Sequence, residues 1–452
     1  MKRIYTLLSL LALGPALFAI NGSPVPVDKN AVNVASLKPD DYMHNTLILK
    51  VLPEYRSLCS VERINIPAVN DFFLTMGEDQ CGKKYPRHEA PKEKFNKYGM
   101  PMIDLSLIYE IHYTGAMPMD MAIAKLMNLG FFEYVEPHII PKISFVPNDP
   151  QATQAQSYYL YKIAAAGSGT TGWDIETGNS NVVIGIVDTG TEYTHSDLSN
   201  QIKISSTEIS GNGIDDDGDG YIDNYRGWDV AMNDNDATWE GNAHGVAVCG
   251  DACAQTNNNN KVAGPGYNCK ILPVKIADAS GTLTAAYDGI VYAADHGCQV
   301  INCSWGGPSA GSYGQNIIDY AMNNKDALVV VAAANDGSDS AVYPAAYDNS
   351  MSVAATNSSD GKAYFSNYNY TVDVCSPGQG ILNTWINNGT ISNDGTSMAS
   401  PVCAGVCAIV RAHYPSYNCY QTKQRVKTTA DNIYSVSGNS AYQDKLGTGR
   451  IN

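Results

Sequence analysis

From residue 182 onward, short and almost continuously apolar segments alternate with segments of helical spacing. A strand buried on both faces needs apolar side chains at nearly every position, so this sequence pattern is typical of a parallel sheet covered by helices on both sides. The pattern predicts an α/β fold in three layers with a mostly parallel central sheet. We expect strands at 182–187, 271–276, 299–305, 327–334 and 350–356, and helices at 284–296 and 313–323.

The stretch from residue 20 to about 150 has a different texture, with charged and irregular segments between a few regular ones. Alternation of apolar and polar residues predicts strands at 46–52, 107–113 and 132–137, and the apolar spacing of 119–129 predicts a short helix. The part at 68–97 matches no pattern that we recognise. These elements predict a small α+β domain ahead of the α/β domain.

The first residues are typical of an export signal. Lys2 and Arg3 precede the apolar run 4–18, and the small residue Ala19 follows it. The alternative is a membrane anchor, but the run is shorter than the roughly 20 apolar residues that a spanning helix needs. We therefore expect a signal peptide at 1–19, no membrane-spanning segment, and a protein that is secreted or associated with the cell envelope.

Charge excludes some partners. The chain has 29 basic and 45 acidic residues and a formal net charge of -16. Attraction to phosphate needs positive patches, so this balance argues against a nucleic acid or an anionic membrane as partner. An acidic chain suits an exported protein that binds hard cations such as calcium.

Eleven cysteines are present, of which Cys59 and Cys81 precede the predicted α/β domain. The nine within that domain cannot all pair with one another. The pairs 249/253 and 403/407 are each spaced to share one face of a helix, as metal ligands do. No neighbouring His or Cys completes a ligand set, so we favour small apolar residues at closely packed helices.

Three polar side chains follow or begin predicted elements in the α/β region. Asp188 comes directly after the first strand and before Thr189 and Gly190, at the strand end where functional groups gather in such sheets. His244 starts a run of small and apolar residues, AHGVAV at 243–248. Taken alone, an aspartate at a strand end is weak evidence and is usually a solvated turn residue, and the histidine alone is also consistent with a core or capping residue.

The third side chain is Ser397, in the segment GTSMASP at 395–401 that leads into the helical run 402–414. Proline is tolerated in the first turn of a helix, so Pro401 predicts that Ser397 lies at the amino end of this helix. Free N–H groups and the helix dipole favour negative charge there.

Taken together, these segments resemble the subtilisin family of serine proteases, over residues 157–452. The order Asp188, His244, Ser397 is the order of that family. GTSMASP and VDTG (187–190) match closely, whereas Val246 stands where the family usually has threonine. The resemblance implies a subtilisin-like fold and a serine endopeptidase that works through an acyl-enzyme intermediate.

The resemblance also implies roles for other residues. Asn335 stands where the family has its side-chain oxyanion donor. Ala334 replaces the usual glycine before it, so a methyl group narrows the pocket for the residue before the cut, or strains a glycine-type backbone. Ser304, Trp305 and Gly306 resemble the segment that pairs with extended substrate, although an ordinary exit from a strand is the alternative.

A calcium site is predicted in the acidic segment 212–223, where carboxylates alternate before glycine. Arg226 stands where a complete EF-hand has its glutamate, so the site is not a full EF-hand. We expect structural calcium and no cofactor for the chemistry; a solvated acidic loop is the alternative. The predicted ligands are Asp215, Asp217, Asp219, the Tyr221 carbonyl and Asp223.

The region 20–150 resembles the family's propeptide, which would be a partner in cis beside the protein or peptide substrates. The domains expected are a signal peptide at 1–19, a propeptide at 20–150 and a catalytic domain at 151–452. Processing is expected between about 137 and 157.

Two other functions remain open from sequence. One is a catalytically silent, calcium-bound binding module that keeps the fold. The other is an esterase with the same triad, which is disfavoured because Gly395 and Ala399 do not form a Gly-x-Ser-x-Gly elbow around Ser397.

Overall fold

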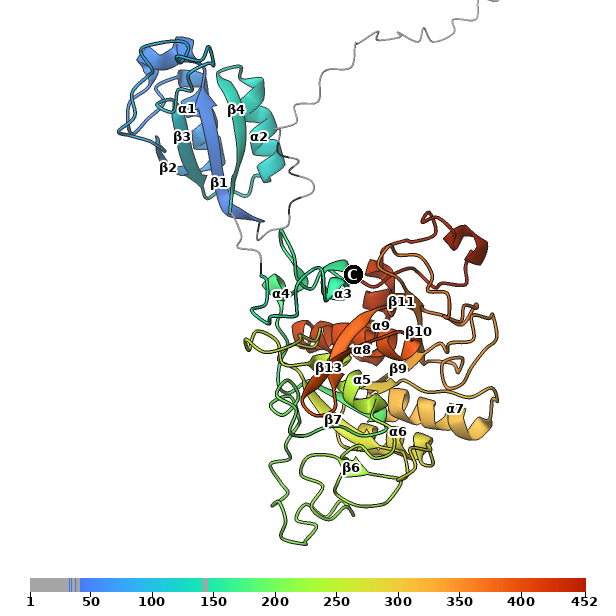
Figure 1. Cartoon of the computed structure of the whole chain (residues 1–452). Coiled ribbons are helices and arrows are strands. Elements are labelled where there is room, and N and C mark those ends of the chain that lie inside the picture. Colours follow the sequence, from blue (N-terminus) through green and yellow to red (C-terminus); the bar gives the residue numbers. More distant parts are fainter. Residues whose placement is uncertain (1–31, 33, 35–36, 38–40, 141–144) are drawn as a thin grey trace, which may run out of the picture. The chain divides into compact units, whose positions relative to one another are not determined.

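A computed structural model of the chain describes residues 32, 34, 37, 41–140 and 145–452 (Figure 1). The chain divides into two compact units, residues 1–141 and 142–452. The predicted signal peptide at 1–19 lies outside the described residues. The predicted propeptide boundary at 150 falls within the second unit, and the bond at which processing occurs stays a prediction.

The first unit is an antiparallel sheet with two helices, in the order βαββαβ. Its strands lie in the order β2-β3-β1-β4. The predicted strands and helix in this region are present. α1 and β2 fall in the stretch for which the sequence predicted nothing. The elements are β1 (Tyr42–Val51), α1 (Pro67–Met76), β2 (Glu78–Lys83), β3 (Ile108–Tyr113), α2 (Met119–Asn128) and β4 (Phe132–Ile139), with a 3₁₀ turn at Pro53–Leu58.

The second unit is built on a seven-stranded parallel sheet in the order β11-β10-β9-β8-β5-β7-β6. Each predicted strand is found as β5, β7, β8, β9 or β10, so the predicted α/β class is confirmed. The two outermost strands were not predicted, since they are too short to show a pattern. The strands are β5 (Val183–Asp188), β6 (Trp228–Asp229), β7 (Lys270–Lys275), β8 (Val300–Cys303), β9 (Leu328–Ala332), β10 (Met351–Thr356) and β11 (Val374–Pro377).

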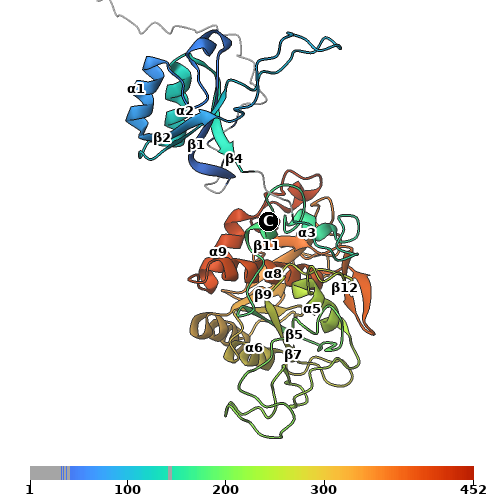
Figure 2. The ribbon, with the colours of Figure 1, turned by 90° about the vertical axis from the view of Figure 1, so that its left-hand side faces the viewer.

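Helices cover both faces of this sheet (Figure 1, Figure 2). Side chains alternate along a strand: a Cβ at Gly185 would meet Ala293 of α6, whereas Asp188 contacts His244 of α5. α8 packs against α5, and α7 packs against α6. The helices are α5 (His244–Cys253), α6 (Ala286–Asp295), α7 (Ser312–Asp319) with a π-helical turn at Tyr320–Asn324, and α8 (Thr396–His413).

The remaining elements lie around this core. They are α3 (Tyr158–Lys162), α4 (Gly172–Ile175), the hairpin of β12 (Ile381–Trp385) and β13 (Gly389–Asn393), α9 (Cys419–Thr429) and a 3₁₀ turn at Asn439–Tyr442.

Within the described part of the chain, no helix combines the length and the apolar character needed to cross a membrane.

α8 begins earlier than the sequence suggested. It starts at Thr396, so Ser397 lies at its amino end as predicted, but Pro401 lies inside the helix and not in its first turn. A proline there removes the N–H that would bond the carbonyl four residues earlier, which belongs to Ser397. That carbonyl instead accepts a hydrogen bond of 2.9 Å from the Ser304 hydroxyl. The Ser304 side chain, which follows the end of β8, thus replaces the hydrogen bond that the proline removes from the helix.

The paired cysteines of α5 and α8 are all buried. The Cys253 thiol donates to the Cys269 carbonyl oxygen at 3.1 Å, and Cys407 Sγ lies 3.9 Å from Met351 Sδ of β10. A Cβ at Gly405 of α8 would come within 2.4 Å of the Ala252 carbonyl oxygen, so the two helices approach closely. The geometry agrees with the packing interpretation of Cys249, Cys253, Cys403 and Cys407.

Candidate active site

Asp188 and His244 are in direct contact at the carboxyl end of β5. His244 Nδ1 lies 2.9 Å from Asp188 Oδ1. Because a carboxylate only accepts, this contact places the histidine proton on Nδ1 and leaves Nε2 as an acceptor. Asp188 is buried, whereas the His244 side chain is 30% exposed. The free ring nitrogen is therefore available to a partner from the solvent side.

Small residues allow this contact. A Cβ at Gly245 would lie 2.2 Å from the Gly190 carbonyl oxygen, so the start of α5 approaches the turn after β5 more closely than a side chain permits. Gly190 also has a φ of 104°, which glycine adopts without strain. The Thr189 hydroxyl accepts a hydrogen bond of 2.8 Å from the Gly245 N–H. These contacts fix the position of the ring.

The environment of His244 affects its protonation. Burial of the ring acts to lower its pKa, but the negative charge of Asp188 and the hydrogen bond to it raise the pKa above the ordinary histidine value. A ring with this property accepts a proton more readily than an ordinary histidine.

Ser397 lies at the start of α8, and its hydroxyl donates to the Ser304 carbonyl oxygen at 3.2 Å. No hydrogen bond among the described residues joins this hydroxyl to His244. As the second residue of the helix, Ser397 has a backbone N–H without a carbonyl partner in the helix. The hydroxyl is thus held by one weak contact, beside a free N–H.

Asn335 has its amide group oriented by Thr396. Its Oδ1 accepts hydrogen bonds from the Thr396 N–H at 2.8 Å and from the Thr396 hydroxyl at 2.9 Å. With both donors on the oxygen, the Nδ2 group is directed away from Thr396. Thr396 precedes Ser397, so the amide donor and the serine hydroxyl belong to one local arrangement.

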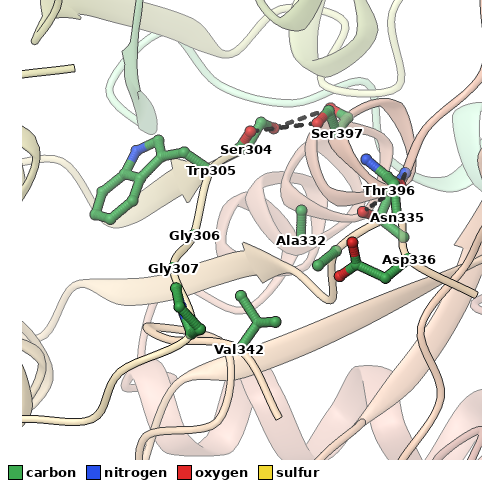
Figure 3. A pocket seen from close by; sticks show the side chains of 12 residues that line it. Ser304, Trp305, Gly306, Gly307, Ala332, Asn335, Asp336, Val342, Thr396 and Ser397 are labelled. Carbon is green, nitrogen blue, oxygen red and sulfur yellow. Dashed lines mark hydrogen bonds between the residues drawn. The ribbon is translucent and has the colours of Figure 1, made fainter. Parts of the chain in front are cut away.

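A pocket of about 440 Å³ adjoins Ser397 (Figure 3). The four predicted substrate-binding residues, Ser304, Trp305, Gly306 and Ala334, all line it. Figure 3 shows Ser397 and Val342 at opposite ends of the pocket. The full lining is Ser304, Trp305, Gly306, Gly307, Pro308, Ala332, Ala334, Asn335, Asp336, Val342, Thr396 and Ser397.

Ala334 adopts a φ of 81°, in the left-handed region that glycine prefers. The expected glycine-type backbone is therefore present, and the alanine methyl group is strained in it. Ala334 lies at the pocket wall beside Asn335, so its methyl group also occupies pocket space.

Several residues of the site were not singled out from the sequence. Thr396 stood within the quoted serine motif, but nothing in the motif indicated that it orients Asn335. Val342 and Asp336 line the pocket because loops far from Ser397 in sequence fold beside it. Their side chains carry no spacing that could have indicated this.

The acidic loop is only partly arranged as predicted. Asp215 and Asp217 come together with Glu208, each offering one ligand oxygen within 4.8 Å of the others. Asp219 instead contacts His296 at 2.8 Å. Asp223 accepts hydrogen bonds from the N–H groups of Gly211, Asn212 and Gly213, and Tyr221 packs against aromatic rings. Glu208, four residues before the segment 212–223, was missed.

One atom of this group is suited to a cation. Glu208 is buried, and its Oε2 atom has no hydrogen-bond partner. A buried carboxylate oxygen without a partner is costly unless a proton or a cation neutralises it. The three carboxylates therefore fit a hard divalent cation with oxygen ligands, such as calcium.

The chemical groups of the main site suit acyl transfer. A carboxylate orients an imidazole whose other nitrogen is free, a serine hydroxyl lies at a helix amino end, and an oriented amide and a backbone N–H are available as donors. Nucleophile, base and oxyanion donors around a pocket are the parts that nucleophilic attack on a carbonyl carbon requires.

Comparison with known proteins agrees with this chemistry. Residues 179–449 match the model described as the Subtilase family. A thermophilic serine proteinase of Bacillus sp. (strain AK1) is 36% identical over 337 residues, which are 74% of this chain and 74% of the relative. Thermitase of Thermoactinomyces vulgaris is 38% identical over 311 residues, 68% of this chain and 98% of the relative.

A solved structure, titled as proteases from Pseudoalteromonas arctica PAMC 21717, is similar with a TM-score of 0.55 and 31% sequence identity. The similarity covers 68% of this chain and 97% of that chain. The matched range 179–449 includes the positions of Asp188, His244, Asn335 and Ser397.

Proposed function

This chain belongs to the subtilase family and is a serine endopeptidase, and we propose that Asp188, His244, Ser397 and Asn335 carry out its chemistry. The observation that supports this assignment best is the 2.9 Å contact between His244 Nδ1 and Asp188 Oδ1. It leaves Nε2 free to act as a base. A catalytically silent module would have no need of a ring held in this tautomer.

In the proposed reaction, the Ser397 hydroxyl leaves the Ser304 carbonyl and turns to His244 Nε2. His244 takes the hydroxyl proton as Ser397 Oγ attacks the scissile carbonyl carbon, and Asp188 stabilises the charged ring. The Asn335 amide and the Ser397 N–H donate to the oxyanion that develops in the transition state. His244 then protonates the leaving amine, and water releases the acyl group by the same route.

Substrate would bind with the residue before the cut in the pocket beside Ser397. Residues 304–306 follow the end of β8 and belong to no strand, so their backbone is available to an extended peptide. Val342 at the far end and the Ala334 methyl group limit the length of side chain that fits. Asp336 is the charged residue of the pocket lining, which favours side chains that are apolar or carry a positive group over acidic ones.

Calcium is proposed to bind at the acidic loop before α5 as a structural ion. Subtilases commonly bind calcium, and the Glu208, Asp215 and Asp217 group supports a site here. The ion would offset most of the negative charge of the three carboxylates and hold the loop, and would take no part in the reaction. Asp219, Tyr221 and Asp223 stay predicted ligands.

Maturation and export complete the proposal. The first unit would be a propeptide that acts in cis and is removed near residues 137–157, and the signal at 1–19 would direct secretion or delivery to the cell envelope. The separate core of the first unit supports an independent role for it. No nucleic acid partner is expected.

The test is peptide hydrolysis by the matured protein. We expect the Ser397→Ala variant to lose turnover by about a million-fold and Asn335→Ala by about 100 to 1,000-fold. Ester turnover measured in parallel separates a protease from an esterase. Equal peptide hydrolysis by the wild type and Ser397→Ala would contradict the assignment.

A further inference from the structure

The two cysteines of the first unit differ from the nine of the second. All eleven thiols are free in the structure; the nine of the second unit are buried, whereas Cys59 and Cys81 are partly exposed. A thiol must be reached by a disulfide in solution before it can be oxidised. Both accessible thiols of the chain thus lie in the first unit, and they are its full complement of cysteines.

The fold brings these two cysteines to one edge of the sheet. Cys59 forms an antiparallel bridge with Ile64, which closes a small hairpin at 59–64. The tip of this hairpin is bonded to β2, since the Val61 carbonyl accepts from the Lys83 N–H at 2.7 Å. Cys81 lies in β2, and its thiol contacts the Ile64 backbone. Bridged residues have Cα atoms about 5 Å apart, so Ile64 adjoins both cysteines.

Tyr109 of β3 is a second neighbour common to both cysteines. Its hydroxyl lies close enough to interact electrostatically with both thiols, and the Cys59 thiol donates to the Tyr55 carbonyl oxygen at 3.5 Å. The Tyr109 hydroxyl also donates to the Ser60 carbonyl oxygen of the hairpin. Both thiols pack against the core of the first unit. They therefore converge on the same small region, between the hairpin and β2.

We propose that Cys59 and Cys81 form a disulfide that fastens the hairpin at 59–64 to the free edge of β2. The inference rests on the proposed export, because disulfides persist in oxidising compartments. The bond would close a loop that contains α1 and would hold in place the hairpin that already bonds to the edge strand β2.

The oxidant is a small-molecule disulfide such as oxidised glutathione. One cysteine thiolate attacks it, forms a mixed disulfide and releases one glutathione thiolate. The second cysteine thiolate attacks the cysteine sulfur of the mixed disulfide and expels the other glutathione. Two electrons pass from the cysteines to the glutathione disulfide, and the two thiol protons go to the solvent or to the released thiolates.

The order of attack follows from the surroundings of each thiol. Burial raises the pKa of Cys81 to about 11. Burial also raises the pKa of Cys59, but the nearby Tyr109 hydroxyl and the charges of Lys83 and Arg56 oppose this effect. Cys59 is thus the better first nucleophile, and the reaction accelerates as the pH rises, since the thiolate reacts.

The experiment uses the full chain with Ser397→Ala, so that the first unit is not cleaved off. The protein is equilibrated with oxidised glutathione at pH 7 and pH 9, free thiols are alkylated in denaturant without reductant, and peptides are mapped by mass spectrometry. We expect one cross-linked product that joins Cys59 to Cys81, formed faster at pH 9. Cys59→Ser must leave Cys81 unlinked, and Cys269→Ser, which removes a buried thiol, must leave the cross-link intact.

A second measurement reports on structure. Trypsin cleavage after Arg63, in the hairpin, should slow several-fold in the oxidised chain, while cleavage after Lys97, in an exposed loop, should not change.

Two results would overturn the proposal. One is that Cys59 and Cys81 are both still alkylated as free thiols after incubation in excess oxidised glutathione. The other is a glutathione adduct on Cys59 that persists with Cys81 present. Because the oxidant is added, a finding that the chain is not exported would leave this result unaffected.

Discussion

Ser304 and Ser397 exchange two hydrogen bonds: each hydroxyl donates to the backbone carbonyl oxygen of the other residue, at 2.9 Å and 3.2 Å (Figure 3). The shorter bond satisfies the carbonyl that Pro401 leaves without its helical partner. The longer one holds the proposed nucleophile until substrate binds. The same contact therefore stabilises the start of α8 and determines the resting position of Ser397.

Ser304→Ala should destabilise the second unit by about 1 to 3 kcal/mol, because it leaves the partly buried Ser397 carbonyl without a donor. Pro401→Ala supplies an N–H that can bond this carbonyl, so the double variant should lose less than Ser304→Ala alone. Denaturant unfolding in the Ser397→Ala background, which keeps the carbonyl, measures both effects. Additive losses would show that the two residues are not coupled through this carbonyl.

The pH dependence of turnover should reflect the raised pKa of His244. The ring must be neutral to accept the serine proton, so activity falls as pH drops through its pKa. Because Asp188 raises that pKa, the acid limb of kcat/KM should lie above about pH 6.5. Asp188→Asn should move this limb to lower pH and reduce kcat by about 10,000-fold. Asp339→Asn, which changes an exposed carboxylate, should do neither.

Ala334→Gly should stabilise the protein by about 1 kcal/mol, because glycine removes the strain at a φ of 81°. It should also raise kcat/KM for peptides with longer side chains before the cut. Thermal unfolding in the Ser397→Ala background and a peptide series with varied side chains measure the two effects. Ala332→Gly is the matched control, since Ala332 lines the same pocket from β9; it should be destabilising.

Calcium removal should lower the unfolding temperature of the second unit. This decrease should occur only in the wild type and in variants whose acidic loop still binds the ion. Glu208→Gln should weaken calcium binding in calorimetric titration and reduce the effect of chelation. Asp216→Asn is the control in the same loop, because this carboxylate accepts from Ile209 and Asn212. An unfolding temperature that chelator leaves unchanged in the wild type would rule out the site.

Asp251 should make stability fall as pH rises. Its side chain is fully buried, and its Oδ2 atom accepts a hydrogen bond from the side-chain amide of Asn383. The Oδ1 atom of Asp251 and the side-chain Oδ1 atom of Asn383 have no hydrogen-bond partner. Burial raises the pKa of Asp251 well above the ordinary value, so the folded state holds a proton that the unfolded state releases. The loss begins near the unfolded carboxyl pKa of about 4 and continues up to the folded pKa, at up to about 1.4 kcal/mol per pH unit.

Asp251→Asn should remove this pH dependence and stabilise the protein at pH 8, because an amide donates to Asn383 without a proton from solvent. Denaturant unfolding at pH 5 and pH 8, at fixed calcium and in the Ser397→Ala background, tests the expectation. A parallel pH dependence in both proteins would show that Asp251 is not responsible.

Much of the fold was predictable from local pattern. The apolar strands of the second unit could be predicted from the sequence, because a strand buried on both faces must be apolar along its whole length. The short edge strands β6 and β11, and α1 and β2 of the first unit, were not predictable, since edges and small elements are stabilised by neighbours and carry little pattern of their own. Pro401 was misplaced for the same reason: its cost is offset by Ser304, a residue far away in the sequence.

The sequence alone determined the class of the fold, the order of Asp188, His244 and Ser397, and the presence of an acidic loop. Each of these features depends on residues that are close together in the sequence or on a short contiguous motif. Only the tertiary structure decided that Thr396 orients Asn335, that Val342 lies at the end of the pocket, and that Glu208 completes the acidic group while Asp219 contacts His296. Each of these facts is a distance between segments that folding brings together, and a linear pattern contains no information on such distances unless one local motif holds both partners.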